Sequence, residues 1–349
     1  MKKKISLIFT KILTPLFVLL TKVRLFLYKK KILKSIKVKI PVLSIGNISM
    51  GGTGKTPFTL WLLNVLKKVN PEKKIGVVAR NYKALNNKSE RVQIHISSPL
   101  YFGDEAVLIQ SKNPDVIVFS GPQKSISALE LLSQEPETNI LIIDDGFQHF
   151  KLERDLDIVL CDVSVPWSYY LFPPTGFLRE PIQSLNRSHI IIFTKCEIKN
   201  EETYLNLKNI VQKISLQGTQ KLIIESEQVL GEPIHFGGTL LENWSGLKSY
   251  FVFAGLAHPE QFAQTLKNKN LTIKDFKSLP DHSLFDQSLI SKLIEESKGS
   301  ICLTTEKDAV KLREWPFDGP PLFVIPMQLK IDSKFEKLLI DKLKLLEFY

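Results

Sequence analysis

The feature that most constrains the fold is a glycine-rich loop joining an apolar strand to a helix. Residues 41–47, "PVLSIGN", predict a buried strand, and residues 55–69 have the apolar spacing of a helix. The loop between them, "SMGGTGKTP" at 49–57, follows the phosphate-binding pattern G-x-x-x-x-G-K-[ST] except that Ser49 replaces the first glycine. This context favours a nucleotide-binding loop over the alternative, a plain glycine-rich turn between strand and helix.

The residue types of this loop suit a bound triphosphate. Glycines let successive backbone N–H groups curl around phosphate oxygens, and the start of the helix adds partial positive charge. We expect Lys55 to reach the β- and γ-phosphates and Thr56 to ligate Mg²⁺. The expected nucleotide-binding residues are Gly51, Gly52, Thr53, Gly54, Lys55 and Thr56.

A second strand supplies the acidic partner that a metal ion held by Thr56 requires. The run "NILIIDD" at 139–145 is apolar and ends in Asp144 and Asp145. Two adjacent carboxylates at the tip of an apolar strand cost free energy unless they bind a metal or a polar ligand. We therefore expect Thr56, Asp144 and Asp145 to form a Mg²⁺ site. The alternative is that one aspartate caps the following turn.

Short β-branched runs alternate with helical patterns along the rest of the chain, which predicts βαβ units. The expected fold class is α/β: a P-loop NTPase-like parallel sheet flanked by helices, a smaller second α/β domain, and an N-terminal membrane-associated helix. The expected boundaries are 1–35 for that helix, 36–220 for the P-loop domain and 221–349 for the second domain.

The net charge of +11 is concentrated at one end of the chain. The first 39 residues hold twelve Lys and Arg side chains, and the first acidic residue is Glu72. The remaining 35 basic and 36 acidic residues nearly cancel, so the body has no basic excess for a nucleic acid. The three cysteines are widely spaced and match no metal-ligand pattern.

The basic N-terminal segment is also apolar. Its longest uncharged run, residues 12–21, has ten residues, whereas a membrane-spanning helix needs about 20. A helix here would carry four lysines on one side: Lys4, Lys11, Lys22 and Lys29. We expect it to lie on a membrane surface, kinked or divided at Pro15. A tilted spanning helix and a helix packed on the protein's own core are the alternatives. A cleaved signal peptide is disfavoured because no alanine precedes Ala79.

Further segments follow in a characteristic order. They are "GDEAVLI" (103–109), "DDGFQHFKLERDLDIVLCD" (144–162), "LFPPTGFLREP" (171–181), "FAGLAHPEQF" (253–262), "PDHSLFD" (280–286) and "TTEKDAVKL" (304–312). Together with the loop they resemble the tetraacyldisaccharide 4′-kinases of lipid A biosynthesis in Gram-negative bacteria, over nearly the whole chain. That family carries Ser or Thr at the position of Ser49.

The resemblance implies a phosphotransferase that moves the γ-phosphoryl group of ATP, with Mg²⁺, to the 4′-hydroxyl of a tetraacyldisaccharide 1-phosphate, forming lipid IVA. It places the catalytic base at Asp104, paired with His282, beside a catalytic Lys55. His258 ranks below His282 as a partner. The implied partners are the acylated disaccharide phosphate and the membrane surface, without nucleic acid. A monomer on the cytoplasmic face of the inner membrane is expected.

Some positions depart from the family or lack a clear role. The segment "ARNYKA" at 79–84 lacks the glycines of the family's "SRGYGG", and Lys124 replaces an arginine, which removes a bidentate phosphate contact. Arg179 is expected either to contact phosphate or sugar or to form a structural ion pair. In "TTEKDAVKL" we expect a structural capped helix with Lys307 and Asp308 exposed.

The rival function is a membrane-tethered P-loop nucleotide switch or ATPase without lipid kinase chemistry. The segment "FTKCE" at 193–197 resembles the guanine-reading motif [NT]-K-x-D, but Glu197 replaces its aspartate. Met50 stands where a positioning ATPase of the "KGGxGKT" type has lysine. The paired carboxylates and the second α/β unit favour catalysis.

Overall fold

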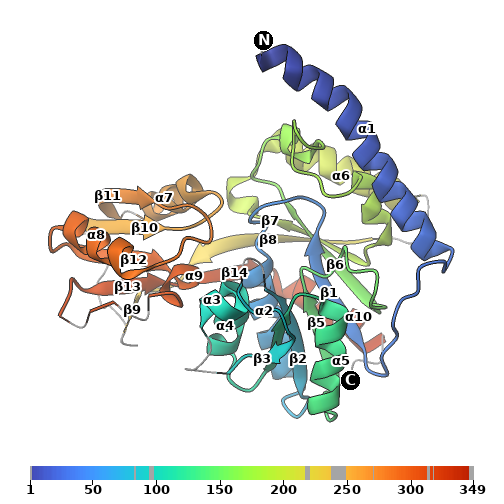
Figure 1. Ribbon diagram of the computed structural model, residues 1–349, viewed down its shortest axis with the longest axis horizontal. Helices are drawn as coiled ribbons and strands as arrows, with labels where there is room; N and C mark the ends of the chain where they lie inside the picture. Colours follow the sequence, from blue (N-terminus) through green and yellow to red (C-terminus); the bar gives the residue numbers. More distant parts are fainter. Residues whose placement is uncertain are drawn as a thin grey trace.

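The computed structural model describes residues 2–81, 84–93, 98–216, 221–236, 249–269, 271–312, 315–316 and 318–345. These residues form two α/β units side by side, each built on its own sheet, with a long helix beside the larger one (Figure 1). The expected α/β class, with a large mostly parallel sheet and a smaller second unit, is confirmed.

The larger unit is built on a sheet of nine described strands. Their order is β14 (Met327–Ile331), β8 (Leu222–Leu230), β7 (Ile190–Thr194), β6 (Leu156–Asp162), β1 (Val42–Asn47), β5 (Ile140–Asp144), β2 (Ile75–Arg80), β4 (Ile117–Gly121) and β3 (Glu90–Arg91). All neighbours pair in parallel except the edge strands β14 and β3, which pair antiparallel. Because β1 and β5 are parallel neighbours, their carboxyl ends, with the polar residues there, lie next to each other at the same end of the sheet.

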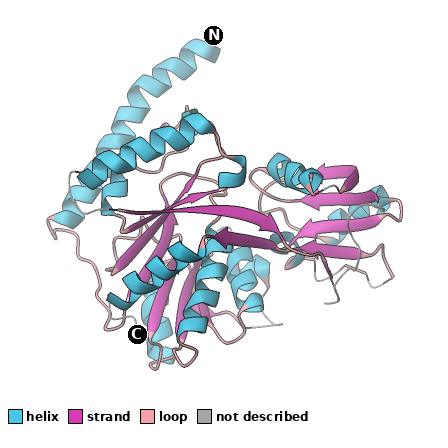
Figure 2. Ribbon diagram, turned by 180° about the vertical axis from the view of Figure 1, so that it is seen from behind, coloured by secondary structure: helices cyan, strands magenta, loops and turns pink. Residues whose placement is uncertain are grey.

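Helices cover both faces of this sheet (Figure 2). One face carries α2 (Lys55–Val69), α4 (Asp104–Lys112) and α10 (Ser333–Leu345), and the other carries α5 (Lys124–Gln134) and α6 (Glu201–Leu216). Side chains of β1 alternate between the two cores, since Leu43 packs under the first set and Val42 under the second. Both faces are thus buried, as the apolar strands predict.

Shorter elements connect these helices and strands. They are α3 (Pro99–Phe102) and the short 3₁₀ helices η1 (Trp167–Tyr170), η2 (Ile182–Arg187) and η3 (Cys196–Ile198). The first two 3₁₀ turns pack against the core under α6, and the segment between them returns to pair with the glycine-rich loop through Ser49 and Leu178.

The smaller unit has a sheet of five described strands, in the order β11 (Thr272–Ser278), β10 (Ser249–Ala254), β12 (Ile301–Thr305), β13 (Leu322–Ile325) and β9 (Ile234–His235). Helix α7 (Pro259–Asn268) covers one face, α8 (Gln287–Ser297) covers the other, and α9 (Glu306–Ala309) follows β12 directly.

The sheet boundaries differ from the expected division at residue 220. Strand β8 pairs in parallel with β7, so residues 222–230 extend the large sheet rather than begin the second unit. After β13 the chain returns, because β14 pairs with β8 and Leu339 and Leu343 of α10 enter the core under α2. The C-terminal segment therefore completes the larger unit, and two crossings of the chain connect the units.

Helix α1 (Lys2–Lys29) is continuous and contains Pro15, so a division into two helices at that residue is not observed. Residues 14–28 of the helix rest on two loops. On the first, Thr14 donates a hydrogen bond to the carbonyl of Pro173 and Phe17 contacts Phe172 with ring centroids 5.7 Å apart. On the second, the ring centroid of Tyr28 lies 5.2 Å from that of Phe150. The N-terminal half projects beyond the body (Figures 1 and 2). Among the described residues, no helix combines the length and apolar character needed to cross a membrane.

The place of α10 in the larger core can be measured. We expect Leu343→Ala, which removes a fully buried side chain, to lower the free energy of unfolding by about 2–5 kcal/mol in urea denaturation. The matched control is Leu338→Ala on the same helix, where the side chain is 41% exposed and the change should stay within about 0.5 kcal/mol. Equal effects would show that α10 does not pack as described.

Candidate active site

The glycine-rich loop turns sharply at two glycines. Gly51 and Gly54 have φ of 100° and 84°, values that disfavour a residue with a side chain. A Cβ on Gly51 would collide with the Tyr169 hydroxyl, which donates a hydrogen bond to the Met50 carbonyl. Ser49 instead pairs in extended conformation with Leu178, so its position needs no glycine. Serine is therefore compatible with a phosphate-binding loop here.

The loop is held from both sides. The Asn47 amide donates to the Thr53 hydroxyl (3.0 Å), and the Thr194 hydroxyl donates to the Thr53 carbonyl (3.0 Å). These contacts come from the ends of β1 and β7, and they bury the Thr53 side chain. Helix α2 then begins at Lys55, with backbone N–H groups of its first turn free of intrahelical partners.

The paired aspartates are buried at the end of β5. Asp145 has a left-handed backbone (φ 53°), and its carboxylate accepts two hydrogen bonds from Arg179 (3.0 and 3.1 Å) and lies 3.5 Å from Lys55 Nζ. Asp144 accepts a hydrogen bond from the Thr59 hydroxyl (3.3 Å). Burial, followed by the negative charge of Glu105, raises the pKa of Asp144 to about 6.

A cavity of about 750 Å³ lies between the glycine-rich loop and the smaller unit. Nine of the expected site residues line it: Gly51, Gly52, Thr53, Gly54, Lys55, Thr56, Asp144, Asp145 and His282. Asp104, the tenth, is not part of the wall but lies directly behind His282. The fold thus brings together all the residues that the sequence analysis assigned to the site.

The expected Asp–His pair joins the two units. Asp104 is the first residue of α4, and His282 lies in the turn after β11 with φ 62°. His282 Nδ1 lies 3.1 Å from Asp104 Oδ2, while Nε2 lies 3.5 Å from Lys307 Nζ. Burial by itself would raise the pKa of Asp104, but the His282 hydrogen bond and the charges of Lys311, Lys307 and His282 lower it below its usual value. The carboxylate is therefore ionised, and the imidazole faces the cavity.

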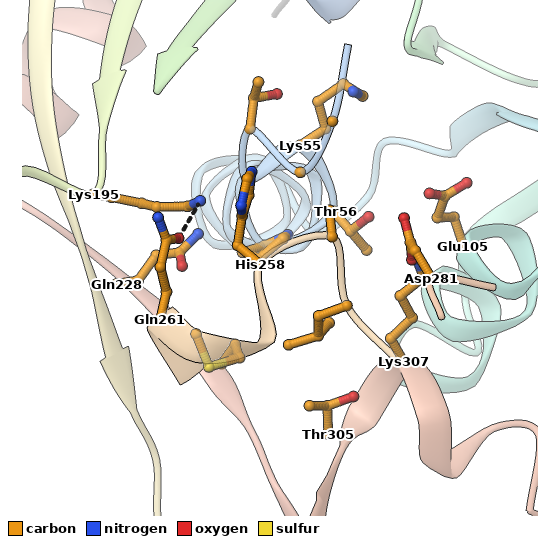
Figure 3. A pocket seen from close by; sticks show the side chains of 18 of the residues that line it. Lys55, Thr56, Glu105, Lys195, Gln228, His258, Gln261, Asp281, Thr305 and Lys307 are labelled. Carbon is orange, nitrogen blue, oxygen red and sulfur yellow. Dashed lines mark hydrogen bonds and ion pairs between the residues drawn. The ribbon is translucent and has the colours of Figure 1, made fainter. Parts of the chain in front are cut away.

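Several cavity residues were not identified from the sequence. Figure 3 shows Lys195, Gln228 and Gln261 gathered on one side of the start of α2, and Glu105, Asp281 and Lys307 on the other. Lys195 Nζ contacts Asp162 (2.6 Å) and Gln261 (3.0 Å). Its place at the carboxyl end of β7 could have indicated a site residue, whereas Gln228 and Gln261 carry no such signal.

The segment "TTEKDAVKL" forms the expected capped helix, α9, whose cap is the Thr305 side chain, but the expected exposure of Lys307 and Asp308 is wrong. Asp308 is completely buried, and Lys307 lines the cavity, where its ammonium contacts Asp281 (2.6 Å). Burial disfavours the charged form of Lys307, but the charges of Glu105 and Asp281 raise its pKa above the usual value, so it stays an ammonium. The sequence could not reveal this, because the segment faces the larger unit across the cavity.

The remaining residues singled out in the sequence either support the site or line the cavity. Lys124 is buried and donates to the backbone carbonyls of Asp144 and Asp145, so it holds the end of β5 and does not face a ligand. Arg179 forms the expected ion pair with Asp145 and also lines the cavity, so the ion pair does not remove it from the reach of a ligand. His149 and His258 both line the cavity. Burial, with the charge of Lys124, lowers the pKa of His149 to about 3, which keeps that imidazole neutral. Tyr82 and Lys83 of the divergent "ARNYKA" lie outside the described residues.

The residues present suit a divalent cation. In the described parts of the chain, no cluster of three or more His, Cys, Asp and Glu side chains could hold a metal. A Mg²⁺ ion, however, is commonly held by one or two carboxylates plus phosphate oxygens and water. The buried Asp144 carboxylate beside Glu105, whose negative charge disfavours its ionisation, is a site that a cation would stabilise.

The raised pKa of Asp144 predicts a pH-dependent cost to stability. Since the folded state binds this proton more tightly than the unfolded state, ionisation above about pH 6 costs on the order of 3 kcal/mol, and the cost is lost as the pH falls to 3.8. We expect Asp144→Asn to raise the urea midpoint of the ligand-free protein at pH 7.5 but not at pH 4. Asp162→Asn is the control, since it removes a buried carboxylate paired with Lys195 and should destabilise. A less stable Asp144→Asn protein at pH 7.5 would contradict this account.

Comparison with known proteins agrees with this geometry. The LpxK family model, described as tetraacyldisaccharide-1-P 4′-kinase, matches residues 7–344. The tetraacyldisaccharide 4′-kinase of Chlorobium limicola is 32% identical over 319 residues, 88% of each chain, and that of Porphyromonas gingivalis is 30% identical over 345 residues, 95% of this chain and 94% of the relative. A crystal structure of LpxK from Aquifex aeolicus in complex with ATP superposes with a TM-score of 0.75 at 27% identity, covering 95% of this chain and 98% of that one. The chain belongs to the tetraacyldisaccharide-1-P 4′-kinase family.

Proposed function

We propose that this protein is an ATP-dependent kinase that phosphorylates the 4′-hydroxyl of a tetraacyldisaccharide 1-phosphate and so forms the bis-phosphorylated lipid A precursor. One observation carries the proposal: a phosphate-binding loop and an Asp–His pair flank the same cavity, which has room for a nucleotide. Family membership supports the substrate, and the ATP complex of the similar structure supports the nucleotide.

The loop would bind the triphosphate. The donors for phosphate oxygens would be the Lys55 ammonium and the backbone N–H groups of Gly51 to Thr56, except that of Thr53, which donates to the Gly51 carbonyl. Lys55 exchanges its contact with Asp145 for the β- and γ-phosphates, while Arg179 continues to neutralise Asp145. The Thr56 hydroxyl and the Asp144 carboxylate would hold Mg²⁺, which supplies positive charge to the phosphates.

The Asp–His pair would position the acceptor hydroxyl and receive its proton. Enzymes accelerate phosphoryl transfer mainly by positioning the reactants and neutralising charge. The side chain that takes the proton from the hydroxyl therefore does not need to be strongly basic. The imidazole of His282 faces the cavity, and the ionised Asp104 behind it fixes the ring and compensates the charge that the proton brings. Lys307, from the same unit as His282, adds a cation at the other ring nitrogen.

We further propose that the enzyme works as a monomer at the cytoplasmic face of the inner membrane, attached through α1. Five apolar side chains on the outer side of that helix are 44–60% exposed: Leu16, Leu19, Leu20, Val23 and Phe26. The opposite side contacts the protein through Thr14, Phe17 and Arg24. An apolar stripe beside a basic segment suits insertion into an anionic lipid surface, where an acylated substrate is found.

The catalytic assignment is tested with labelled ATP and acylated disaccharide phosphates, followed by location of the new phosphate. Lys55→Met should reduce phosphoryl transfer by more than about 10²-fold, because it removes the positive charge that would stabilise the transferred phosphoryl group. His282→Gln should lower kcat by about 10²–10⁴-fold.

His258→Gln is the matched control, since this histidine also lines the cavity but has no contact with Asp104 among those described. A larger loss for His258→Gln than for His282→Gln would reverse the assignment. Nucleotide hydrolysis without any phosphorylated lipid, or a preference for GTP, would support the rival switch or ATPase function instead.

The membrane proposal is tested by sedimentation with vesicles of phosphatidylethanolamine and phosphatidylglycerol. Replacing Leu16, Leu20 and Val23 by serine should weaken binding by at least about tenfold, because inserted apolar area is lost. The matched control replaces three exposed leucines elsewhere on the protein: Leu129, Leu205 and Leu216. Equal vesicle binding of both triple variants would contradict attachment through α1.

A further inference from the structure

A buried ion pair lies behind the Asp–His pair, at the end of α9. Asp308 is completely buried, and its Oδ2 accepts hydrogen bonds from the Gly255 backbone N–H (2.8 Å) and the Thr305 hydroxyl (2.8 Å). These two donors fix the carboxylate and leave Oδ1 for Lys311, whose Nζ lies 2.9 Å away in an ion pair that lacks hydrogen-bond geometry. Asp308 thus holds the lysine in a defined place.

Lys311 connects this anchor to Asp104. Its side chain is only 6% exposed, its ammonium lies 5.0 Å from the ring centroid of Phe285, and Nζ is 3.5 Å from Asp104 Oδ2. Desolvating a lysine is costly and requires compensating partners, which here are the carboxylates of Asp308 and Asp104. One of them belongs to the smaller unit and the other to the larger unit.

We infer that Lys311, fixed by Asp308, is a positioning residue that orients the Asp104 carboxylate toward His282 across the junction of the two units. The inference rests on the kinase function proposed above. Asp104 Oδ2 lies 3.1 Å from His282 Nδ1 and 3.5 Å from Lys311 Nζ, so the charge of the lysine attracts that oxygen and affects where it lies when the imidazole takes a proton. Lys311 is not among the residues lining the cavity and acts through Asp104.

A second ion pair also connects α4 of the larger unit to α9 of the smaller unit. Lys112 at the end of α4 pairs with Glu306 at the start of α9, so both ends of α4 are connected to the α9 segment by opposite charges. The charged groups that face the Asp–His pair come from every element around it. They are Glu105 on α4, Asp281 in the turn after β11, and Lys307, Asp308 and Lys311 in the α9 segment.

The charge of each member predicts opposite effects on the pH profile. Lys311→Met removes a positive charge beside the Asp–His pair, so the apparent pKa of the pair rises. The acid limb of the kcat/KM profile therefore shifts to higher pH. Asp308→Asn removes a negative charge while keeping the shape of the side chain, so the acid limb shifts to lower pH. A merely structural role would lower activity without shifting the limb in opposite directions.

The experiment measures kcat, KM for ATP and the pH profile of the full-length enzyme with the lipid substrate. We expect Lys311→Met to lower kcat about tenfold or more with little change in KM, and Lys311→Arg to restore most of the rate. In an Asp104→Asn background, Lys311→Met should have no further effect. Lys277→Met, which breaks a partly exposed ion pair with Glu296 in the same unit, should leave rate and profile unchanged.

Two results would overturn the inference: a Lys311→Met enzyme with wild-type kcat and pH profile, or one whose loss is undiminished in the Asp104→Asn background. If Lys311→Met does not fold, judged by circular dichroism, Asp308→Asn decides, because a folded variant with an unshifted acid limb contradicts the inference. A wild-type enzyme that does not phosphorylate the lipid would instead refute the kinase function itself.

Discussion

The burial of two adjacent carboxylates at the end of β5 is the constraint on which the rest of the site depends. Asp144 is the last residue of the central strand β5 and Asp145 follows it, and both are buried, so their ionised forms are costly unless compensated. Compensation comes from different parts of the chain: Lys55 starts α2, Arg179 lies in the loop between η1 and η2, and Lys124 starts α5. The sheet order, which places β1 beside β5, makes these contacts possible.

The site is completed only by the second unit. The phosphate-binding loop and the paired aspartates belong to the large sheet, whereas His282 and Lys307 belong to the smaller one. Asp104 is held from the opposite side by His282 and Lys311, so the proton-accepting group exists only when the units are in contact. Because β14 and α10 return to the larger unit, the smaller unit is connected at both of its ends. This double connection limits how far the two halves of the site can separate.

The N-terminal helix and the phosphate-binding side of the cavity both belong to the larger unit and share a loop. Phe172 and Pro173, which support α1, belong to the segment that continues to Leu178 and Arg179. Leu178 pairs with the glycine-rich loop, and Arg179 contacts Asp145. A short stretch of chain therefore joins the apolar helix to the phosphate-binding site, an arrangement suited to a substrate with acyl chains and a sugar hydroxyl.

The sequence by itself determined the elements and the first half of the site. The spacing of "SMGGTGKTP" after an apolar strand predicted α2 at Lys55–Val69, and "NILIIDD" predicted a strand that ends in buried carboxylates. These signals are local: a motif and its flanking periodicity lie within a few turns of chain. The pairing of Asp104 with His282 came from resemblance to a family, since no local pattern relates residues 178 positions apart.

Only the tertiary structure decided which distant groups meet. Asp308 and Lys307 resemble exposed charges in sequence, yet Asp308 is buried against Gly255 and Thr305 of its own unit, and Lys307 lines the cavity between the two units. The domain boundary was also decided in three dimensions, since β8 and β14 join the large sheet through hydrogen bonds to strands that are remote in sequence. Burial and strand pairing depend on the packed surroundings of a residue, and the residue's own neighbours in the chain do not specify them.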